Sequence, residues 1–358
     1  MLLNIQVLRA MAALLVVIVH LEVLGAALGA GKTFFNLFAV GVDLFFVISG
    51  FIMVHTTSHR PVSPGAFLVS RLVRIAPLYW LLTLLVFALA LASPSLLGGT
   101  RADLGALLNS LAFLPHVRDD GTMRPILFVG WSLNLEVAFY LVFAFALTTP
   151  TVAKRIGLGV LLLVLAVAVG AVLNRKLPAE VRFLTQPMLL EFAAGMVIGW
   201  IYPRLPQSRQ LARHAAVVGL VALVALVIVA RWPLPGGWPV SLPPAALVVL
   251  SALVAEKGGL MLGWRPLQVI GDASYALYLT HPFVTQAWTM AAMKSGVLTP
   301  STAPVLMAGA MFSAVAVAVM VHARVERPLG RWAKRQADRL AFTQAAQRNV
   351  NLRQETFK

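Results

Sequence analysis

The feature that most constrains this chain is a series of long apolar segments with few charged residues. A helix that crosses a bilayer needs about 20 apolar residues, because each residue adds about 1.5 Å along the axis. Hydrophobic residues make up 59% of the 358 residues and charged residues only 12%. We predict an all-α polytopic membrane protein with about ten transmembrane helices. We place them near 5–28, 35–55, 74–93, 126–147, 156–173, 186–203, 215–231, 241–256, 267–290 and 304–323.

Basic residues predict the orientation of these helices. The chain has 29 Lys and Arg and a formal net charge of +16. With both termini in the cytoplasm, 20 of the 29 fall in cytoplasmic segments, which agrees with the positive-inside rule. This rule accounts for the charge better than binding to nucleic acid does, so we expect no nucleic-acid partner. We predict a transmembrane domain at 1–323 and a basic cytoplasmic tail at 324–358 that lies on anionic lipid.

Two further features limit the architecture and the chemistry. The segment 101–115 is short and contains Arg101, Asp103 and Asn109, so we predict an interfacial helix there rather than an eleventh span. The chain has no cysteine, which excludes disulfides, cysteine-ligated metal sites and a thiol nucleophile. We predict no metal site.

The first apolar segment carries Arg9 at its start and His20 eleven residues later. Eleven residues are close to three helical turns, so both side chains share a face and lie roughly 16 Å apart along the axis. His20 would then lie near mid-membrane, where an ionisable residue should face the protein interior or a water-filled cavity. A histidine that only bonds a neighbouring helix is the alternative.

Polar residues also interrupt the second apolar segment, at Asp43, Ser49 and Gly50. Asp43 can cap a helix or bond to a neighbouring span. Ser49 and Gly50 can break the helix and let a ligand approach the backbone.

Arg71 and Arg74 are three residues apart where the next segment enters the membrane. They lie on one helix face, where two guanidinium groups can bind phosphate oxygens bidentately. Ordinary anchoring, with Tyr79 and Trp80 at the membrane interface, is the alternative.

The fourth segment contains Trp131 and, near its middle, Glu136. Glu136 lies at a depth comparable with His20. We therefore predict an ion pair or proton relay between them, in which the carboxylate orients the imidazole.

The ninth segment carries a polar stripe. Tyr275 and Tyr278 share a face, and His281 lies one turn beyond Tyr278. The stripe suits a hydroxylated ligand, and interhelical bonding is the alternative. The histidines near span ends or in loops receive no role: His55, His59, His116, His214 and His322.

These motifs together resemble the membrane acyltransferases of family 3, which O-acylate bacterial surface polysaccharides. The resemblance covers about the first 330 residues and is closest to the exopolysaccharide-modifying branch. Its signs are the Arg9–His20 spacing, GVDLFFVISGF at 41–51, Arg71 and Arg74 leading into Pro77-Leu78-Tyr79-Trp80, WSLNLEVAFY at 131–140 and SYALYLTHPF at 274–283.

The resemblance implies transfer of an acyl group, most simply acetyl, from cytoplasmic acyl-coenzyme A to a hydroxyl of an extracytoplasmic glycan or its lipid-linked precursor. Acyl-coenzyme A is then a donor substrate bound by Arg9, Arg71 and Arg74, and no cofactor is tightly bound. His20 acts as general base or transient acyl carrier, supported by Glu136. Asp43, Ser49, Tyr79, Trp131, Tyr275, Tyr278 and His281 are expected to give polar support or to contact the acceptor.

The same resemblance implies a multi-pass protein of the bacterial cytoplasmic (inner) membrane. Membrane lipids, a second copy of the chain and polysaccharide-assembly proteins are its further expected partners. Two other functions stay open at this point. One is a transporter or flippase of a glycolipid, since midplane polar residues also mark transporters. The other is an acyltransferase that acts on a lipid or a small metabolite.

Overall fold

The computed structural model describes residues 2–58, 62–93, 102–118, 121–230 and 240–339. Within these ranges the protein is helical, and the only β interaction is an isolated bridge between Val117 and Met123. The α-helices are α1 (Leu3–Val19), α2 (Glu22–Gly25), α3 (Lys32–Asn36), α4 (Gly41–Thr57), α5 (Pro64–Ala92), α6 (Leu104–Leu111), α7 (Trp131–Ala146), α8 (Val152–Leu173), α9 (Ala179–Leu184), α10 (Leu189–Ile201), α11 (Arg209–Val229), α12 (Leu242–Lys257), α13 (Arg265–Asp272), α14 (Ser274–Lys294) and α15 (Ala303–Val321).

Several of these helices are long and apolar enough to cross a membrane. Seven runs in the described ranges pass by length and composition, and the bent pair Leu3–Val19 and Glu22–Leu28 would make an eighth. The predicted spans 241–256 and 267–290 are also helical, as α12 and α14. However, α12 has only 16 residues, and α14 carries polar Tyr, Thr, His and Gln side chains. Neither helix is therefore both long enough and apolar enough to count among the candidate membrane spans. The number ten therefore stays a prediction.

The first span is broken at His20. Helix α1 ends at Val19, His20 forms its C-cap, and the chain turns by 57° before α2 begins at Glu22. The prediction of one regular helix over 5–28 is therefore wrong. The break places His20 at a helix end, where its side chain is half-buried.

Helix α4, by contrast, runs unbroken through Ser49 and Gly50, which corrects the predicted break there. Gly50 instead lets α4 and α10 approach at backbone distance. A Cβ atom on Gly50 would lie 2.1 Å from the carbonyl oxygen of Phe192, and one on Gly195 would lie 2.1 Å from that of Val47. Small residues at such contacts are typical of helix packing in membranes.

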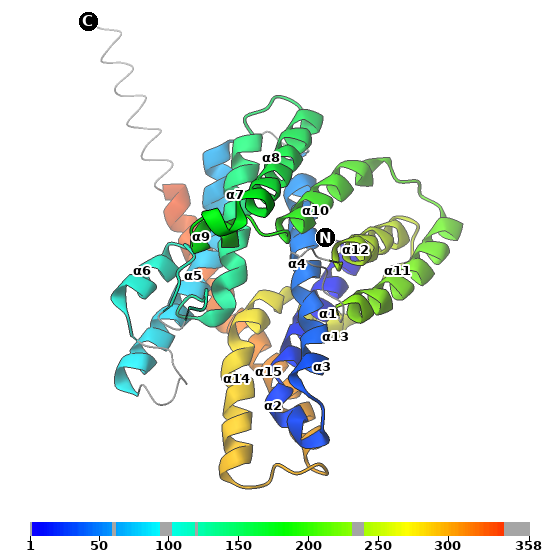
Figure 1. The fold of residues 1–358 in the computed structure, drawn as a ribbon. Coiled ribbons are helices and arrows are strands. Elements are labelled where there is room, and N and C mark those ends of the chain that lie inside the picture. Colours follow the sequence, from blue (N-terminus) through cyan, green and yellow to red (C-terminus); the bar gives the residue numbers. More distant parts are fainter. Residues whose placement is uncertain (1, 59–61, 94–101, 119–120, 231–239, 340–358) are drawn as a thin grey trace, which may run out of the picture.

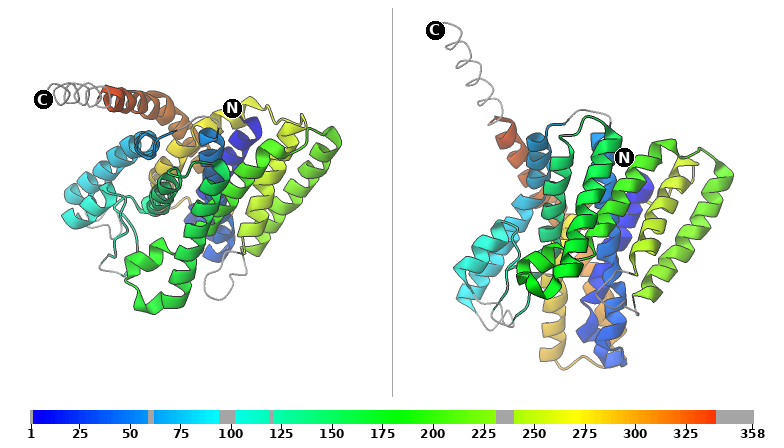
Figure 2. Two further views of the ribbon diagram at one scale, coloured as in Figure 1. Left: turned by 90° about the horizontal axis from the view of Figure 1, so that it is seen from above. Right: turned by 45° about the horizontal axis from the view of Figure 1, so that its top comes forward.

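The other helices surround this α1–α4–α10 centre. Figures 1 and 2 show α11 and α12 on one side of it and α5 with α6 on the other, while α14 and α15 run together beside α2. Helix α6 has eight residues, so it is too short to cross a bilayer, and its Leu111 carbonyl accepts a hydrogen bond from Trp80 Nε1 (2.8 Å).

Helix α15 continues into a π-helical turn, η8 (His322–Glu326), and the helical run extends to Arg339. The predicted boundary between 323 and 324 thus lies within one helical run. Residues 340–358 of the predicted tail lie outside the described residues.

Candidate active site

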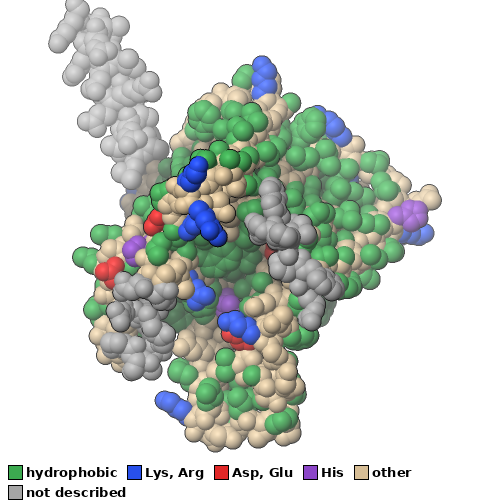
Figure 3. All heavy atoms as spheres, viewed as in Figure 1, with side chains coloured by type: hydrophobic (Ala, Val, Ile, Leu, Met, Phe, Trp, Pro, Cys, Tyr) green, Lys and Arg blue, Asp and Glu red, His purple; other side chains and the backbone are tan. Residues whose placement is uncertain are grey.

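A cavity of about 420 Å³ lies between α1, α4, α5, α7 and α14, toward the end of the bundle that holds the start of α1. Figure 3 shows the molecule hollowed near its middle, with basic and histidine side chains around the hollow. Apolar residues form much of the wall. The polar lining consists of Gln6, Arg9, Ser49, His55, Thr56, Arg71, Arg74, Ser132, Glu136, Tyr140, Ser274, Tyr275 and Tyr278.

The three predicted arginines, Arg9, Arg71 and Arg74, all line this cavity. Helix α5 begins at Pro64, so Arg71 and Arg74 lie inside the helix rather than at its entrance, and they still share a face. Neither forms a hydrogen bond or ion pair with another described residue, and Arg71 only packs its guanidinium carbon 5.6 Å from the ring centre of Phe67. Two guanidinium groups that form no direct ion pair within the described residues can bind an anionic ligand such as a phosphate.

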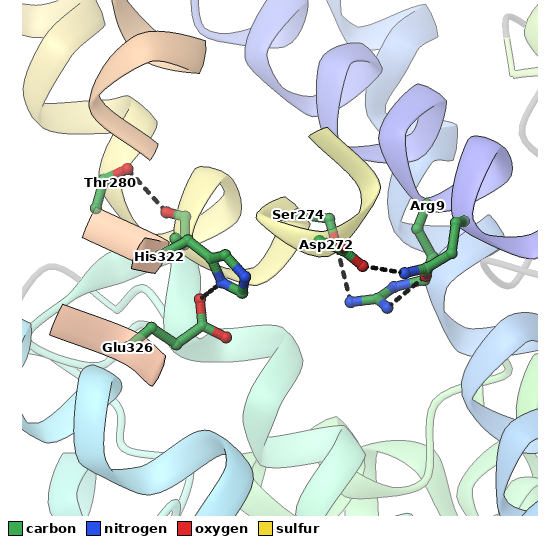
Figure 4. Close-up of polar contacts among 8 residues, drawn as sticks. Arg9, Asp272, Ser274, Thr280, His322 and Glu326 are labelled. Atoms are coloured by element: carbon green, nitrogen blue, oxygen red, sulfur yellow. Dashed lines mark hydrogen bonds and ion pairs between the residues drawn. The ribbon is translucent and has the colours of Figure 1, made fainter. Parts of the chain in front are cut away.

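Arg9, in contrast, is held by a polar network at the junction of α1 with α13 and α14 (Figure 4). It donates from Nη1 to Gln6 Oε1 (2.7 Å) and from Nη2 to Ser274 Oγ (2.9 Å). Gln6 in turn donates from Nε2 to Asp272 Oδ1 (2.5 Å). The network fixes the orientation of Arg9 in the cavity wall and supplies a nearby negative charge.

Glu136 also lines the cavity, but it is not paired with His20. Its Oε1 accepts hydrogen bonds from Tyr140 (2.5 Å) and Ser49 (3.2 Å), and no bond in the described structure joins it to the imidazole. The predicted His20–Glu136 contact is therefore wrong. Equal depth in two helices does not bring two side chains together when the helices present different faces.

His20 instead contacts His281. The two ring centres are 4.8 Å apart with a 38° tilt, and Phe128 packs against His20 at 5.4 Å. Neither histidine lines the cavity. Tyr278 lies between the cavity and the histidine pair. It lines the cavity, and its ring centre is 6.2 Å from that of His281. Its hydroxyl bonds Ser132 Oγ (2.7 Å) and donates to the Val129 carbonyl (2.9 Å).

The remaining predicted residues divide between the cavity and the core. Ser49 and Tyr275 line the cavity, and the Tyr275 hydroxyl donates to the carbonyl of Ile75 (2.6 Å). Three others do not reach the cavity. Asp43 is buried and accepts a hydrogen bond from Ser241, Tyr79 stacks on Phe113 at 5.0 Å, and Trp131 packs edge-on against Phe183.

Six polar lining residues were not predicted from the sequence: Gln6, Thr56, Ser132, Tyr140 and Ser274, together with His55, which received no role. Helical spacing was an available signal for three of them. Ser132 and Tyr140 are one turn before and after Glu136, and Gln6 is one turn before Arg9, so they share faces with residues already selected. Ser274 was visible only as the start of the polar stripe.

The architecture and this cavity define a membrane-embedded protein with a cationic, anion-compatible site, and the comparisons give its class. The model of a family described as an acyltransferase domain matches residues 2–323, and the chain belongs to this family of membrane acyltransferases.

The chain is 36% identical over 301 residues to the exopolysaccharide production protein ExoZ of Rhizobium meliloti, which covers 82% of this chain and 90% of that protein. It is 28% identical over 307 residues to the putative membrane-bound transacylase BcsY of Komagataeibacter xylinus, covering 80% and 75%. The O-acetyltransferase OatA of Staphylococcus aureus is 23% identical over 280 residues, covering 68% of this chain and 45% of OatA. No solved structure matches the chain.

Proposed function

We propose that this membrane acyltransferase moves an acyl group, with acetyl the first donor to test, from acyl-coenzyme A to a hydroxyl of an exopolysaccharide or its lipid-linked precursor. One observation carries the proposal: Arg9, Arg71 and Arg74 gather in one cavity, and Arg71 and Arg74 form no ion pair with any described residue. Coenzyme A is rich in phosphate, and guanidinium groups bind phosphate bidentately. Similarity to the exopolysaccharide production protein supports a glycan as the acceptor.

The proposal also assigns an orientation. About ten helices span the cytoplasmic membrane of a bacterium, both termini are cytoplasmic, and the arginine cavity faces the cytoplasmic donor. The donor binds on the arginine-cavity side of Tyr278, and the acceptor hydroxyl approaches His20 from the other side of this residue. The donor thioester must then reach past Tyr278, so this residue would separate the two substrates until both are bound.

In the direct route His20 takes the proton from the acceptor hydroxyl, and the oxygen attacks the carbonyl carbon of the thioester. The C–S bond breaks, coenzyme A leaves as a thiolate, and the thiolate takes up the proton held by His20. The products are an ester and coenzyme A. In the second route His20 carries the acyl group briefly as an acyl-imidazole. An acceptor-independent burst of coenzyme A release would distinguish the second route from the first.

Glu136 has a different role in this proposal. Its bonds to Ser49 and Tyr140 make it part of the donor cavity, where it positions those side chains and offsets part of the arginine charge. A transporter or flippase is not favoured, because the family match describes an acyltransferase.

The proposal is tested by mass spectrometry of surface polysaccharide from a deletion strain of the source organism. The strain is complemented with the wild type, with His20→Ala or with His214→Ala. His214 is exposed on α11 and away from the cavity, so it is a matched control. We expect acylation with the wild type and His214→Ala, and none with His20→Ala at equal protein level. Unchanged polysaccharide in the deletion strain would refute the assigned acceptor.

A further inference from the structure

His281 is the one buried histidine in the described bundle that contacts His20. It lies inside α14 and has no exposed surface. Its Nδ1 is 3.0 Å from the Leu277 carbonyl oxygen, one turn earlier in the same helix. Its Nε2 is buried and has no hydrogen-bond partner among the described residues.

These contacts fix the tautomer of His281. A carbonyl oxygen only accepts hydrogen bonds, so Nδ1 carries the proton and Nε2 carries the lone pair. A buried acceptor without a donor costs about 1–3 kcal/mol, so such a group calls for an explanation. Nε2 of His281 is thus a buried hydrogen-bond acceptor that has no donor among the described residues.

His20 is within reach to supply that donor. A linear N–H···N bond places two imidazole centres about 5 Å apart, because the nitrogens are then about 2.9 Å apart and each lies about 1.1 Å from its ring centre. The observed separation between the His20 and His281 ring centres is 4.8 Å. His20 is half-buried at the broken end of α1, and the hydrogen bond requires its ring to turn so that one nitrogen faces Nε2 of His281. No carboxylate bonds either ring in the described structure, which leaves the second imidazole as the available partner.

We propose that His281 is the positioning residue for His20. Its Nε2 accepts a hydrogen bond from one ring nitrogen of His20, which leaves the lone pair on the other nitrogen directed at the acceptor hydroxyl. When His20 takes the hydroxyl proton, the same bond stabilises the imidazolium, and the proton later leaves with coenzyme A. His281 itself gains and loses no proton. This inference rests on the proposed function, and it gives His281 the part that a carboxylate has in many catalytic triads.

Two substitutions separate this role from a structural one. In His281→Gln the terminal amide lies where Nε2 lies, so its oxygen can accept from His20. In His281→Asn the amide nitrogen can still donate to the Leu277 carbonyl, but the shorter side chain places no acceptor within hydrogen-bond distance of His20. We expect His281→Asn to lower kcat about 10- to 100-fold, the range for lost orienting partners, with the donor KM unchanged. His281→Gln should keep clearly more activity. Yield and thermal unfolding establish that both variants fold.

A structural role through Leu277 predicts the reverse order, with Asn near wild type and Gln impaired. That order, or equal activity of the two folded variants, would overturn the proposal.

A second measurement does not depend on activity. Imidazole ¹⁵N NMR of the lipid-reconstituted protein, labelled at its seven histidines, identifies His281 by the signal lost in His281→Asn and His20 by the signal lost in His20→Gln. We expect His281 as the neutral Nδ1–H tautomer and a shifted His20 signal when His281 is replaced. An unshifted His20 signal would overturn the pairing. If the wild type fails to use acyl-coenzyme A while the shift is present, the proposed function fails and the pairing stands.

Discussion

Glu136 shows how neighbours, rather than depth in the membrane, decide what an ionisable residue does. It shares the cavity with Arg9, Arg71 and Arg74, and its carboxylate is bonded by Tyr140 and Ser49. A negative charge in this cavity weakens the attraction between the arginines and an anionic donor. The same carboxylate keeps two polar side chains in place, so its charge and its hydrogen bonds have opposite effects on donor binding.

We therefore predict that Glu136→Gln, which keeps the shape and the acceptor oxygen, tightens coenzyme A binding. A gain of about two- to fivefold corresponds to the roughly 0.5–1 kcal/mol typical of a partly solvated charge pair. Isothermal titration calorimetry on the purified protein measures the affinity of each variant for coenzyme A. Unchanged affinity with a large loss of kcat would instead indicate that Glu136 acts on the reacting groups.

The free guanidinium groups on α5 lead to a second residue-scale prediction. Arg71→Ala combined with Arg74→Ala should weaken coenzyme A binding at least about tenfold, because hydrogen bonds to charged groups contribute about 1.5–3 kcal/mol each. Thermal stability should change little, since neither arginine bonds another described residue.

The matched control for this pair is Arg209→Ala with Arg213→Ala, two exposed arginines at the start of α11 that do not line the cavity. If both double variants bind coenzyme A like the wild type, Arg71 and Arg74 only anchor α5 at the membrane surface.

At the scale of elements, the close contact between α4 and α10 positions one wall of the cavity. Glycines allow it: a Cβ atom on Gly195 would lie 2.1 Å from the Val47 carbonyl oxygen and 2.8 Å from the backbone nitrogen of Phe51. Backbone atoms cannot move aside as a flexible side chain can. An added methyl group must therefore separate the two helices, and Ser49 on α4 would move away from Glu136 on α7.

We predict that Gly195→Ala lowers the stability of the protein by about 1–3 kcal/mol, the usual cost of overpacking. The control is Gly157→Ala in α8, where a Cβ atom would meet no other atom within 4 Å, so stability should hold or rise. The midpoints of thermal unfolding of Gly195→Ala and Gly157→Ala, measured in the same detergent, compare the stability of the two variants. Equal midpoints for the two variants would contradict a close α4–α10 contact.

At the scale of the whole molecule, the distribution of basic residues predicts which face is cytoplasmic. Reporter fusions after Lys358 and within 113–124 should report opposite sides, because an odd number of predicted spans separates 113–124 from the C-terminus. A phosphatase and a fluorescent reporter at each site make the two signals complementary. The same side for both fusions would exclude the ten-span arrangement.

The sequence alone determined the features that depend on position along one helix. Apolar length predicted the membrane helices, and spacing of three or four residues predicted that Arg71 shares a face with Arg74. The number of residues between them predicted that His20 lies deeper in the membrane than Arg9. Each of these follows from a fixed rise and a fixed number of residues per turn, so the linear pattern is sufficient.

Tertiary structure alone decided which faces of different helices meet. His20 contacts His281, Glu136 holds Tyr140 and Ser49, and Asp43 is buried against Ser241. The rotation of one helix against another depends on local features such as the glycine contacts between α4 and α10 and the 57° break after α1. These features act between segments far apart in the chain. For this reason the sequence singled out seven of the thirteen polar residues that line the cavity, but the contact between His20 and His281 could be seen only in the packed bundle.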